Sequence, residues 1–427
     1  MVLTSLRKRP IRMSFSIILH RPLAVSAGIV LLLFLTIGVL DSVHINSIQD
    51  GTENAESLLD KILDPIGSTY EKTYSAPLAL TMFVTETTLI AGVTKQVYPR
   101  LNYIPETIKT ETDKNELIKK ELGRSLKYSI FVSLGFWLVL IFIKLGLRSS
   151  HVYRLNSSEI SALLTLGALV FAVLCSFWIS RSFHLLGTGQ IGQDIFYFSV
   201  KSVRTGLIIG LLTTLFMLPL ALFLGIAAGY FGGVIDDIIQ YIYTTLSSVP
   251  GVLLITASVL SLQTYIASHP DQFTTLAQSA DARLLALCLI LGVTSWTSLC
   301  RLLRAETLKL REVDYVIAAR AQGSNWFTII RKHLLPNVMH IVVITLVLDF
   351  SFLVMAEAVL SYVGVGVSPM TISWGNMING ARLELARDPL VWWPMFAAFL
   401  LMFLLVLAIN LFADAVRDAF DPHQSNM

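Results

Sequence analysis

Residues 205–230 read TGLIIGLLTTLFMLPLALFLGIAAGY, a run that contains no charged side chain. A helix needs roughly 20 apolar residues to cross the hydrocarbon core of a bilayer, because each residue rises only about 1.5 Å. The run therefore predicts a membrane-spanning helix. Seven further segments are apolar over a similar or slightly shorter length and predict further spans, at 23–40, 128–147, 160–179, 238–262, 284–300, 338–360 and 389–413.

The composition of the whole chain agrees with this pattern. Of its 427 residues, 54% are hydrophobic and only 14% are charged, whereas soluble domains carry about 25% charged residues. The same figures exclude a disordered chain, and a net charge of +3 is too small to indicate a nucleic-acid partner. All three cysteines lie inside apolar runs, so neither a disulfide framework nor a metal cluster is indicated. We predict an all-α polytopic membrane protein with about eight transmembrane helices.

The distribution of positive charge predicts the orientation of the chain. Residues 1–22 hold five Lys or Arg and no acid, so we expect a cytoplasmic N-terminus followed by a retained signal anchor at 23–40. Eight crossings return the C-terminus to the cytoplasm. They also place there the loop 301–337, with seven basic residues against three acids. The segment 181–204 fits less well, because it is predicted to be external yet holds three basic residues against one acid.

A polar insert, residues 41–127, separates the first two spans and holds ten basic and thirteen acidic residues. Long translocated segments largely escape the positive-inside rule, so we expect the insert on the extracytoplasmic side. Within it, 78–93 is apolar around Glu86 and predicts a packed or interfacial helix, and 105–127 has the apolar spacing of an amphipathic helix. We predict that the insert is an accessory module.

The sequence lacks the short motifs of several catalytic classes. It contains no GxxxxGK[ST] phosphate loop, no HExxH, no GxSxG and no CxxC. A membrane protein without a nucleotide site can be a channel, a secondary transporter, or the membrane part of a pump that another subunit energises. We therefore predict a transport subunit rather than an enzyme.

The loop 311–337 reads REVDYVIAARAQGSNWFTIIRKHLLPN. It resembles the EAA signature of permease subunits of binding-protein-dependent ABC importers. Ile317-Ala318-Ala319 takes the EAA place, Gly323 follows after three residues, and His333-Leu334-Leu335-Pro336 follows after nine more. Ile317 replaces the Glu of the signature, so a polar contact made by that Glu is not expected here.

Further matches extend the resemblance over roughly 184–422. They are His184–Thr188 with Gly192–Asp194, then Ala228–Gly233, Glu357–Gly366 with Ser373–Met377, and Asn410–Asp421 with Pro422. Together these motifs are similar to the second permease subunit of oligopeptide/dipeptide importers, which usually has six spans. The spans 128–147 and 160–179 are additional. The predicted parts are 1–22, 23–40, the insert 41–127, the extra pair 128–179, and a permease domain 180–422 with its coupling loop 301–337.

The resemblance implies a set of partners and a location. It implies a homologous permease subunit as heterodimer partner, two cytoplasmic ATPase subunits, an extracytoplasmic substrate-binding protein, and membrane lipid around a multi-pass protein of the bacterial inner membrane. ATP and Mg²⁺ are expected on the ATPase subunits, and no cofactor is expected on this chain. The implied cargo is a peptide.

The coupling loop also has a physical interpretation. We expect a helix around 313–321, a turn at Gly323, where glycine adopts a backbone conformation costly for other residues, and a second helix around 325–333. Pro336 suits the first turn of the next span. An ordinary connector between two spans is the alternative. The residues predicted to contact the ATPase are Tyr315, Ala318, Ala319, Arg320, Ala321, Gly323, His333, Leu335 and Pro336.

Two acids lie inside the span 338–360, where charge is costly. Asp349 and Glu357 are candidates for a translocation path or a proton relay, and the alternative is a structural role, with Asp349 hydrogen-bonded to a neighbouring helix and Glu357 near the outer boundary. Pro250 is a candidate gate or a packing irregularity. The alternative functions are a proton-coupled secondary transporter that uses these acids and a membrane scaffold that presents 41–127.

Overall fold

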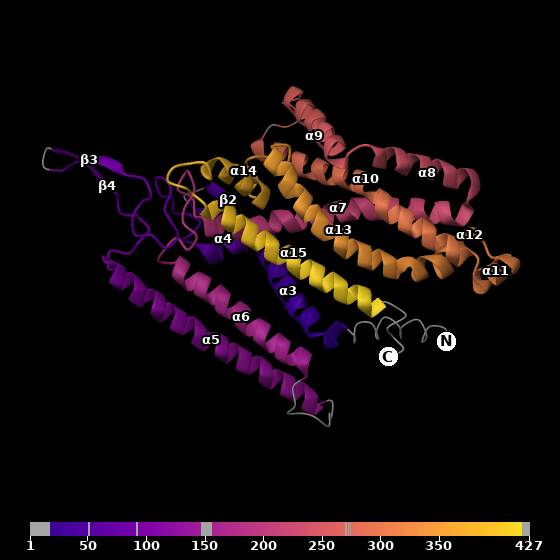
Figure 1. Ribbon diagram of the computed structural model, residues 1–427, viewed down its shortest axis with the longest axis horizontal. Coiled ribbons are helices and arrows are strands. Elements are labelled where there is room, and N and C mark those ends of the chain that lie inside the picture. Colours follow the sequence, from indigo (N-terminus) through magenta and orange to yellow (C-terminus); the bar gives the residue numbers. More distant parts are fainter. Residues whose placement is uncertain are drawn as a thin grey trace. The chain divides into compact units, whose positions relative to one another are not determined.

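The computed structural model describes residues 18–49, 52–90, 93–146, 156–269, 271, 273 and 275–420. The basic residues of 1–17 and the final Asp421-Pro422 of the C-terminal motif lie outside this range. The chain divides into two compact units, Met1–Thr205 with Ile372–Met427, and Gly206–Thr371. Helices dominate both units (Figure 1).

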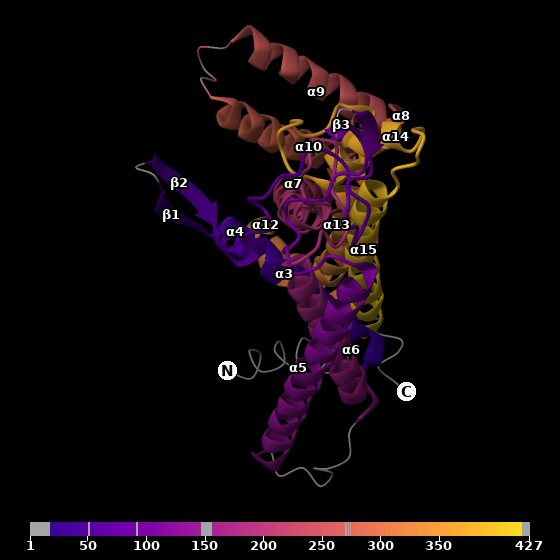
Figure 2. The ribbon, with the colours of Figure 1, turned by 90° about the vertical axis from the view of Figure 1, so that its left-hand side faces the viewer.

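The first unit contains a row of packed helices. These are α3 (Pro22–Ser42), α5 (Glu111–Gly146), α6 (Ser157–Ser180) and α15 (Trp393–Phe420), with the short α14 (Trp374–Glu384) and the start of α7 (Ile195–Phe231). α5 packs on α6, α6 on α3, and α3 on α15. Figures 1 and 2 both show α5 and α6 side by side.

Small residues allow these helices to approach closely. The Ser129 hydroxyl of α5 donates to the Gly167 carbonyl of α6 at 2.7 Å. The Ser26 hydroxyl of α3 lies 2.6 Å from Ser161 and 2.7 Å from Thr165 of α6. Membrane helices usually contact one another through small side chains and hydroxyl hydrogen bonds. Lipid tails are as apolar as the side chains, so the hydrophobic effect does not drive the helices together. The two additional spans are therefore attached to α3 through α6.

The second unit contains the rest of α7 and the helices α8 (Gly233–Ser248), α9 (Gly251–Ser268), α10 (Leu276–Arg311), α11 (Asp314–Ala321), α12 (Trp326–Ile329) and α13 (Leu335–Val363). Its main core lies between α7, α10 and α13, with Met217, Leu299, Leu303 and Val338 fully buried. α7 and α10 cross closely because Gly225 and Gly229 face Leu303 and Thr307 without a side chain between them.

Eight helices in the described part of the chain are long and apolar enough to cross a membrane, which confirms the polytopic prediction. One predicted span is wrong. The segment 238–262 is not continuous, because α8 ends at Ser248 and α9 begins at Gly251. Pro250 pushes the residue before it out of the helical region, and Val249 is extended, with φ −87° and ψ 132°. The candidate span here is α9, Gly251–Ser268.

For the insert, the helix predicted at 78–93 is wrong, and the amphipathic helix predicted at 105–127 is present from Glu111 on. The segment 78–93 is not a helix: β3 (Glu86–Ile90) pairs antiparallel with β4 (Val93–Val97) in the register Glu86↔Val97. Its β-branched residues favour a strand over a helix. β1 (His44–Gln49) and β2 (Thr52–Ser57) form a second hairpin before the short helix α4 (Leu58–Leu63). The amphipathic helix starts at Glu111 and continues into the following span as α5.

The centre of the insert is not a separable module. Met82, Leu101, Ile104 and Ile108 are buried in one cluster with Phe183, which follows α6. In a second cluster, Tyr74 of the insert packs with Ile195, Val391 and Trp393. Residues 74–108 are therefore packed into the first unit, and the accessory role of the insert stays a prediction. Two hairpins of the insert extend from the core of this unit, β3–β4 in Figure 1 and β1–β2 in Figure 2.

Candidate functional site

The turn after α11 has the predicted geometry. α11 ends at Ala321, and Gly323 has φ +75°, in the left-handed region that favours glycine. A Cβ at Gly323 would meet no atom within 4 Å, so a larger residue there would be disfavoured by backbone conformation rather than by a clash. This confirms the predicted helix and turn. We call residues 313–334 the knob.

The second half of the knob differs from the prediction. α12 continues through a π-helical turn, Ile330–Leu334, directly into α13, so that residues 326–363 form one helix. The Leu335 N–H donates to the carbonyl of Ile330, five residues back. A proline inside an α-helix lacks a donor and crowds the carbonyl four residues earlier, and the wider turn before Pro336 accommodates this. Pro336 thus lies in the first turn of α13, as predicted, but α13 is continuous with the helix before it.

One face of the knob is anchored in the core of the second unit. Val316, Ile329 and Leu334 are fully buried there, and Ala319 and Leu335 pack against the same cluster.

The knob also contacts the C-terminal end of α7. The Arg320 guanidinium lies 5.5 Å from the ring centroid of Tyr230. The rings of Trp326 and Phe231 lie 5.7 Å apart. The knob therefore packs against the motif AGYFGG at 228–233.

Polar contacts join the start of α11 to the end of the π-helical turn. The Asn337 amide donates to the Tyr315 hydroxyl at 2.7 Å, and the Tyr315 and His333 rings lie 5.8 Å apart. At the base of the knob, Arg304 of α10 binds Asp236 of α8 through two hydrogen bonds of 2.5 and 2.6 Å. The first two contacts hold the two halves of the knob together, and the Arg304–Asp236 pair joins α10 to α8.

The opposite face of the knob is exposed and partly apolar. Trp326 and Phe327 are 51% and 55% exposed. Ile317, Ala318 and Ala321 are exposed as well. An apolar surface of this kind indicates a contact with another protein. The sequence predicted the alanines but missed Trp326 and Phe327, whose exposure depends on how the knob packs.

The two intramembrane acids occupy different surroundings on α13. Glu357 is 2% exposed and accepts a hydrogen bond from the Ser361 hydroxyl at 2.8 Å, inside the second unit. Asp349 is half-buried, and among the described residues its Oδ2 has no hydrogen-bond partner. It adjoins an exposed stripe of α13 at helical spacing, formed by Leu348, Phe352, Met355 and Val359. The two candidate acids thus have different surroundings, one buried and hydrogen-bonded and the other half-buried.

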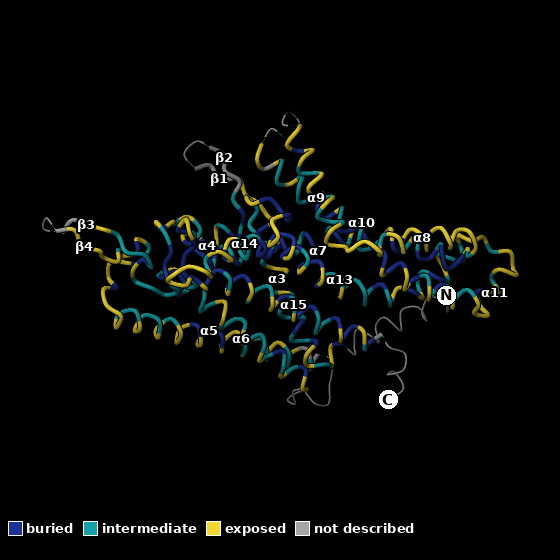
Figure 3. Tube along the Cα trace, turned by 45° about the horizontal axis from the view of Figure 1, so that its top comes forward, coloured by how far each residue is buried: buried dark blue, intermediate teal, exposed yellow. Residues whose placement is uncertain are grey.

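Pro250 is exposed at the break between α8 and α9. Before the break, α8 also exposes most of its length (Figure 3). Its exposed apolar residues are Val234, Ile235, Ile238, Tyr241 and Ile242.

A buried charged cluster lies at the loop between α6 and α7 in the first unit. His184 is 1% exposed, and its Nδ1 lies 2.6 Å from Asp194 Oδ2. On the other side of the ring, Nε2 lies 3.8 Å from Glu71 Oε1 of the insert. The Tyr103 ring stacks on the imidazole with centroids 4.8 Å apart, and the Tyr103 N–H donates to Glu71. The sequence identified His184 and Asp194 as motif residues but gave no signal for Glu71.

This cluster favours a charged imidazole. Burial alone would lower the pKa of His184, but Asp194 and Glu71 outweigh it and raise that pKa to about 9. Burial alone would raise the pKa of Glu71, but His184 and backbone N–H groups outweigh it and lower that pKa. His184 is thus an imidazolium at neutral pH, held between two carboxylates. It joins the insert to the segment that precedes α7.

A second charged group explains the misplaced basic residues of 181–204. Lys201 of α7 binds Asp60 of α4 at 2.5 Å, and Arg204 lies 3.7 Å from the buried Asp41. Burial of Asp60 would raise its pKa, but hydrogen bonds from Lys201 and Tyr197 lower it instead. The basic residues are thus neutralised by acids of the insert and of the end of α3.

The chain is similar to permease subunits of transport systems. The family model for the inner membrane component of binding-protein-dependent transport systems matches residues 221–426. Three similar proteins are the dipeptide transport system permease protein DppC of Lactococcus lactis, that of Bacillus subtilis, and the glutathione transport system permease protein GsiD of Pectobacterium atrosepticum. They are 31%, 29% and 32% identical to this chain.

These alignments cover part of this chain and part of each relative. They cover 57%, 56% and 56% of this chain, in the same order, and 64%, 68% and 73% of the relatives. In the first of them the chain therefore spans less than two thirds of the relative's length.

Proposed function

The chain belongs to the family of inner-membrane components of binding-protein-dependent transport systems, and from this we propose that it forms part of the pathway of an ATP-driven peptide importer. A member of this family is a multi-pass transport subunit of the inner membrane and not an enzyme. Its family implies a substrate-binding protein and ATPase subunits as partners. The proposed complex contains a homologous permease and two ATPase subunits that bind ATP and Mg²⁺.

Peptide is the proposed cargo because of the relatives. Two of those described are named for dipeptide transport, and a third for transport of glutathione, itself a small peptide. The family model matches residues 221–426, a range that includes the knob and α13.

The proposed coupling mechanism starts at the knob. Its exposed side chains, with Trp326 and Phe327 foremost, would seat in a groove of an ATPase subunit. The coupling mechanism is supported most directly by the continuity of α12, the π-helical turn and α13. A movement of the knob would pass along one helix into the membrane, because no flexible linker lies between them. A rigid lever of this kind suits alternation by rocking of packed helices.

The translocation path is proposed to run along the exposed stripe of α13. Asp349 adjoins this stripe and is the candidate polar contact for a passing peptide. Pro250, at the break between α8 and α9, is the candidate hinge of a gate. Glu357 is buried and bonded to Ser361 on its own helix. We therefore assign it a structural role, and a proton relay that links the two acids is not supported.

Replacing Gly323 with valine tests the coupling role. The left-handed turn disfavours a β-branched residue by roughly 1–3 kcal/mol, so the knob would be displaced while the spans, which do not depend on this turn, insert normally. We expect peptide uptake and substrate-stimulated ATP hydrolysis to fall together in proteoliposomes that hold the complete complex. Lys309→Ala, at an exposed position of α10, is the control and should have little effect. Wild-type uptake in Gly323→Val would identify the knob as an ordinary connector.

Thiol labelling tests the proposed orientation, in which both termini are cytoplasmic. After replacement of the native cysteines, a membrane-impermeant reagent should label Gln96→Cys, on the exposed β4, from outside intact cells. Ser150→Cys, in the α5–α6 connection outside the described residues, should react only after the membrane is opened. Ser75 is unsuitable as the outer position because it is fully buried. External labelling at both positions would mean that α5 and α6 do not cross.

A further inference from the structure

We propose that the α5–α6 hairpin carries a binding site for one anionic phospholipid, with the headgroup at the basic end of α5 and an acyl chain in the groove below it. Neither helix belongs to the segment that matches the family model, which starts at residue 221. The site is therefore a property of the added hairpin.

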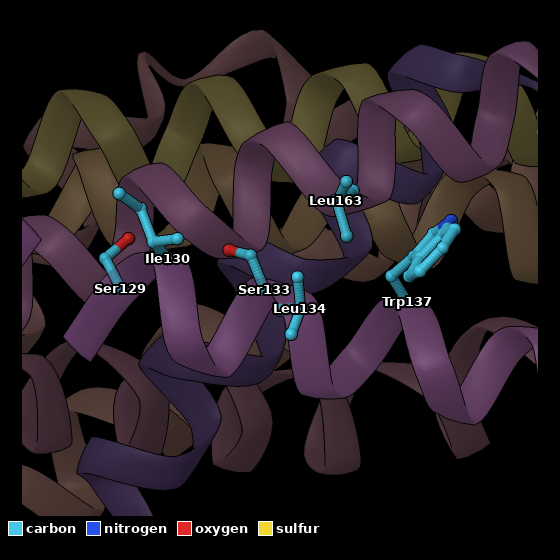
Figure 4. Close-up of a pocket in the computed structure, with 6 residues that line it drawn as sticks. All are labelled: Ser129, Ile130, Ser133, Leu134, Trp137 and Leu163. Atoms are coloured by element: carbon cyan, nitrogen blue, oxygen red, sulfur yellow. The ribbon is translucent and has the colours of Figure 1, made fainter. Parts of the chain in front are cut away.

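The groove lies along one side of α5. It has a volume of about 430 Å³ and is lined by Ser129, Ile130, Ser133, Leu134 and Trp137 of α5 and by Leu163 of α6. Figure 4 shows Leu163 reaching from α6 toward the side chains of α5. The volume lies within the range of roughly 300–1,000 Å³ that is typical of ligand sites.

Along α5, a basic stretch of one helix face is followed by an apolar stretch of the same face. Lys120, Arg124 and Lys127 follow one another at spacings of four and three residues, and Ile130, Leu134 and Trp137 continue at three, four and three. Spacings of three and four keep residues on neighbouring positions of one helix face. A single stripe therefore runs from three basic side chains into the groove, in the order in which a phospholipid presents its phosphate and its chain.

The basic end of the stripe is available for a phosphate. Lys120 and Lys127 are exposed, and no ion pair with an acid is formed by either of them among the described residues. The Arg124 guanidinium is held 3.8 Å from the ring centroid of Trp178 and lies 3.8 Å from Glu121. Trp178, which contacts Arg124, and Tyr128, which follows Lys127, are aromatic residues of the kind that is enriched at membrane interfaces.

The length of the groove favours a lipid chain over a helix of another protein. From Ser129 to Trp137 the groove extends over eight residues, which is about 12 Å of helix. A partner helix that crosses the bilayer would require a complementary face of about 30 Å. One acyl chain needs only a short groove that opens sideways into the bilayer.

The test uses the purified full-length protein, first stripped of lipid and then titrated with phosphatidylglycerol or with zwitterionic phosphatidylcholine, and native mass spectrometry counts the bound lipid. We expect preferential binding of one phosphatidylglycerol. Lys120→Gln with Lys127→Gln should weaken that binding by about tenfold or more, because each basic residue contributes to attraction of an anionic headgroup. Lys95→Gln with Lys109→Gln, at exposed positions of the insert, is the matched control and should bind as wild type.

Leu134→Trp provides an independent arm, because it fills the groove and leaves the basic residues in place. It should lower binding of both lipids. Equal binding of the two lipids by the wild type, or unchanged binding in the double Gln variant, would overturn the proposal. So would a photo-crosslinker at position 134 that reacts in membranes with a polypeptide instead of a lipid.

Discussion

Replacing Gly229 with leucine should separate α7 from α10 and destabilise the second unit by about 3 kcal/mol or more. A Cβ at Gly229 would lie 2.5 Å from the Thr307 Cβ and 2.8 Å from the Arg304 carbonyl oxygen. The carbonyl belongs to the α10 backbone, so the contact cannot be relieved by a side-chain rotation. The two helices would have to move apart at the point where they support the knob.

The measurement is the thermal unfolding temperature of the purified protein in detergent. Gly135→Leu is the matched control, since a Cβ at Gly135 meets no atom within 4 Å and the residue lies inside α5. It should be neutral or slightly stabilising, because leucine is a better helix former than glycine. An unchanged unfolding temperature in Gly229→Leu would contradict the close crossing of α7 and α10.

Replacing His184 with alanine should destabilise the first unit by about 3–5 kcal/mol, the usual cost of leaving buried charges without their partner. Asp194 and Glu71 would then lie near each other without the imidazolium between them. We expect residues 74–108 to become sensitive to protease and the unfolding temperature to fall. His44→Ala, at an exposed position of the insert, should change neither. Equal protease resistance in the two variants would show that the cluster does not attach the insert.

The same cluster predicts that the stability of the folded protein depends on pH. The folded pKa of His184, about 9, lies above its ordinary value of 6.5, so its contribution to stability is complete below about pH 6.5 and is lost as the pH rises through 9. Glu71 acts in the opposite direction: its pKa is lowered, so its contribution is present above its ordinary value of 4.5 and is lost in more acidic solution. The unfolding temperature of the wild type should therefore fall between pH 6.5 and 9. This fall should disappear in His184→Ala.

Much of the fold could be predicted from local sequence. Membrane spans are recognisable because each must be apolar over its full length. Five of the eight predicted segments lie within single helices, and two more, 128–147 and 389–413, each overlap one helix and extend past one of its ends. The break in the segment 238–262 could also have been predicted, because Pro250 disfavours a helical conformation at Val249. The helix and turn of the knob were also predictable, because Gly323 has a local conformational role. The continuation through Pro336 was not, because a proline usually begins a helix and only the π-helical turn permits it here.

The contacts between distant segments could not be predicted. Lys201 and Arg204 were unexpected for an external segment because their acidic partners, Asp60 and Asp41, lie more than a hundred residues away in the sequence. No feature of the sequence distinguishes Glu71 from the other acids of the insert, because its contact with His184 depends on the fold. The exposure of Phe327 likewise depends on which side of α12 packs against α7 and α10.

ATP-dependent uptake of a labelled dipeptide into proteoliposomes that hold the complete complex tests the central claim most directly. We expect uptake only with ATP on the side of the ATPase subunits. This uptake should be lost in Phe327→Asp, which places a charge on the exposed face of the knob. Leu383→Asp, at an exposed apolar position of α14 outside the knob, should transport as wild type. Uptake driven by a proton gradient through this chain alone, or undiminished uptake in Phe327→Asp, would contradict the account.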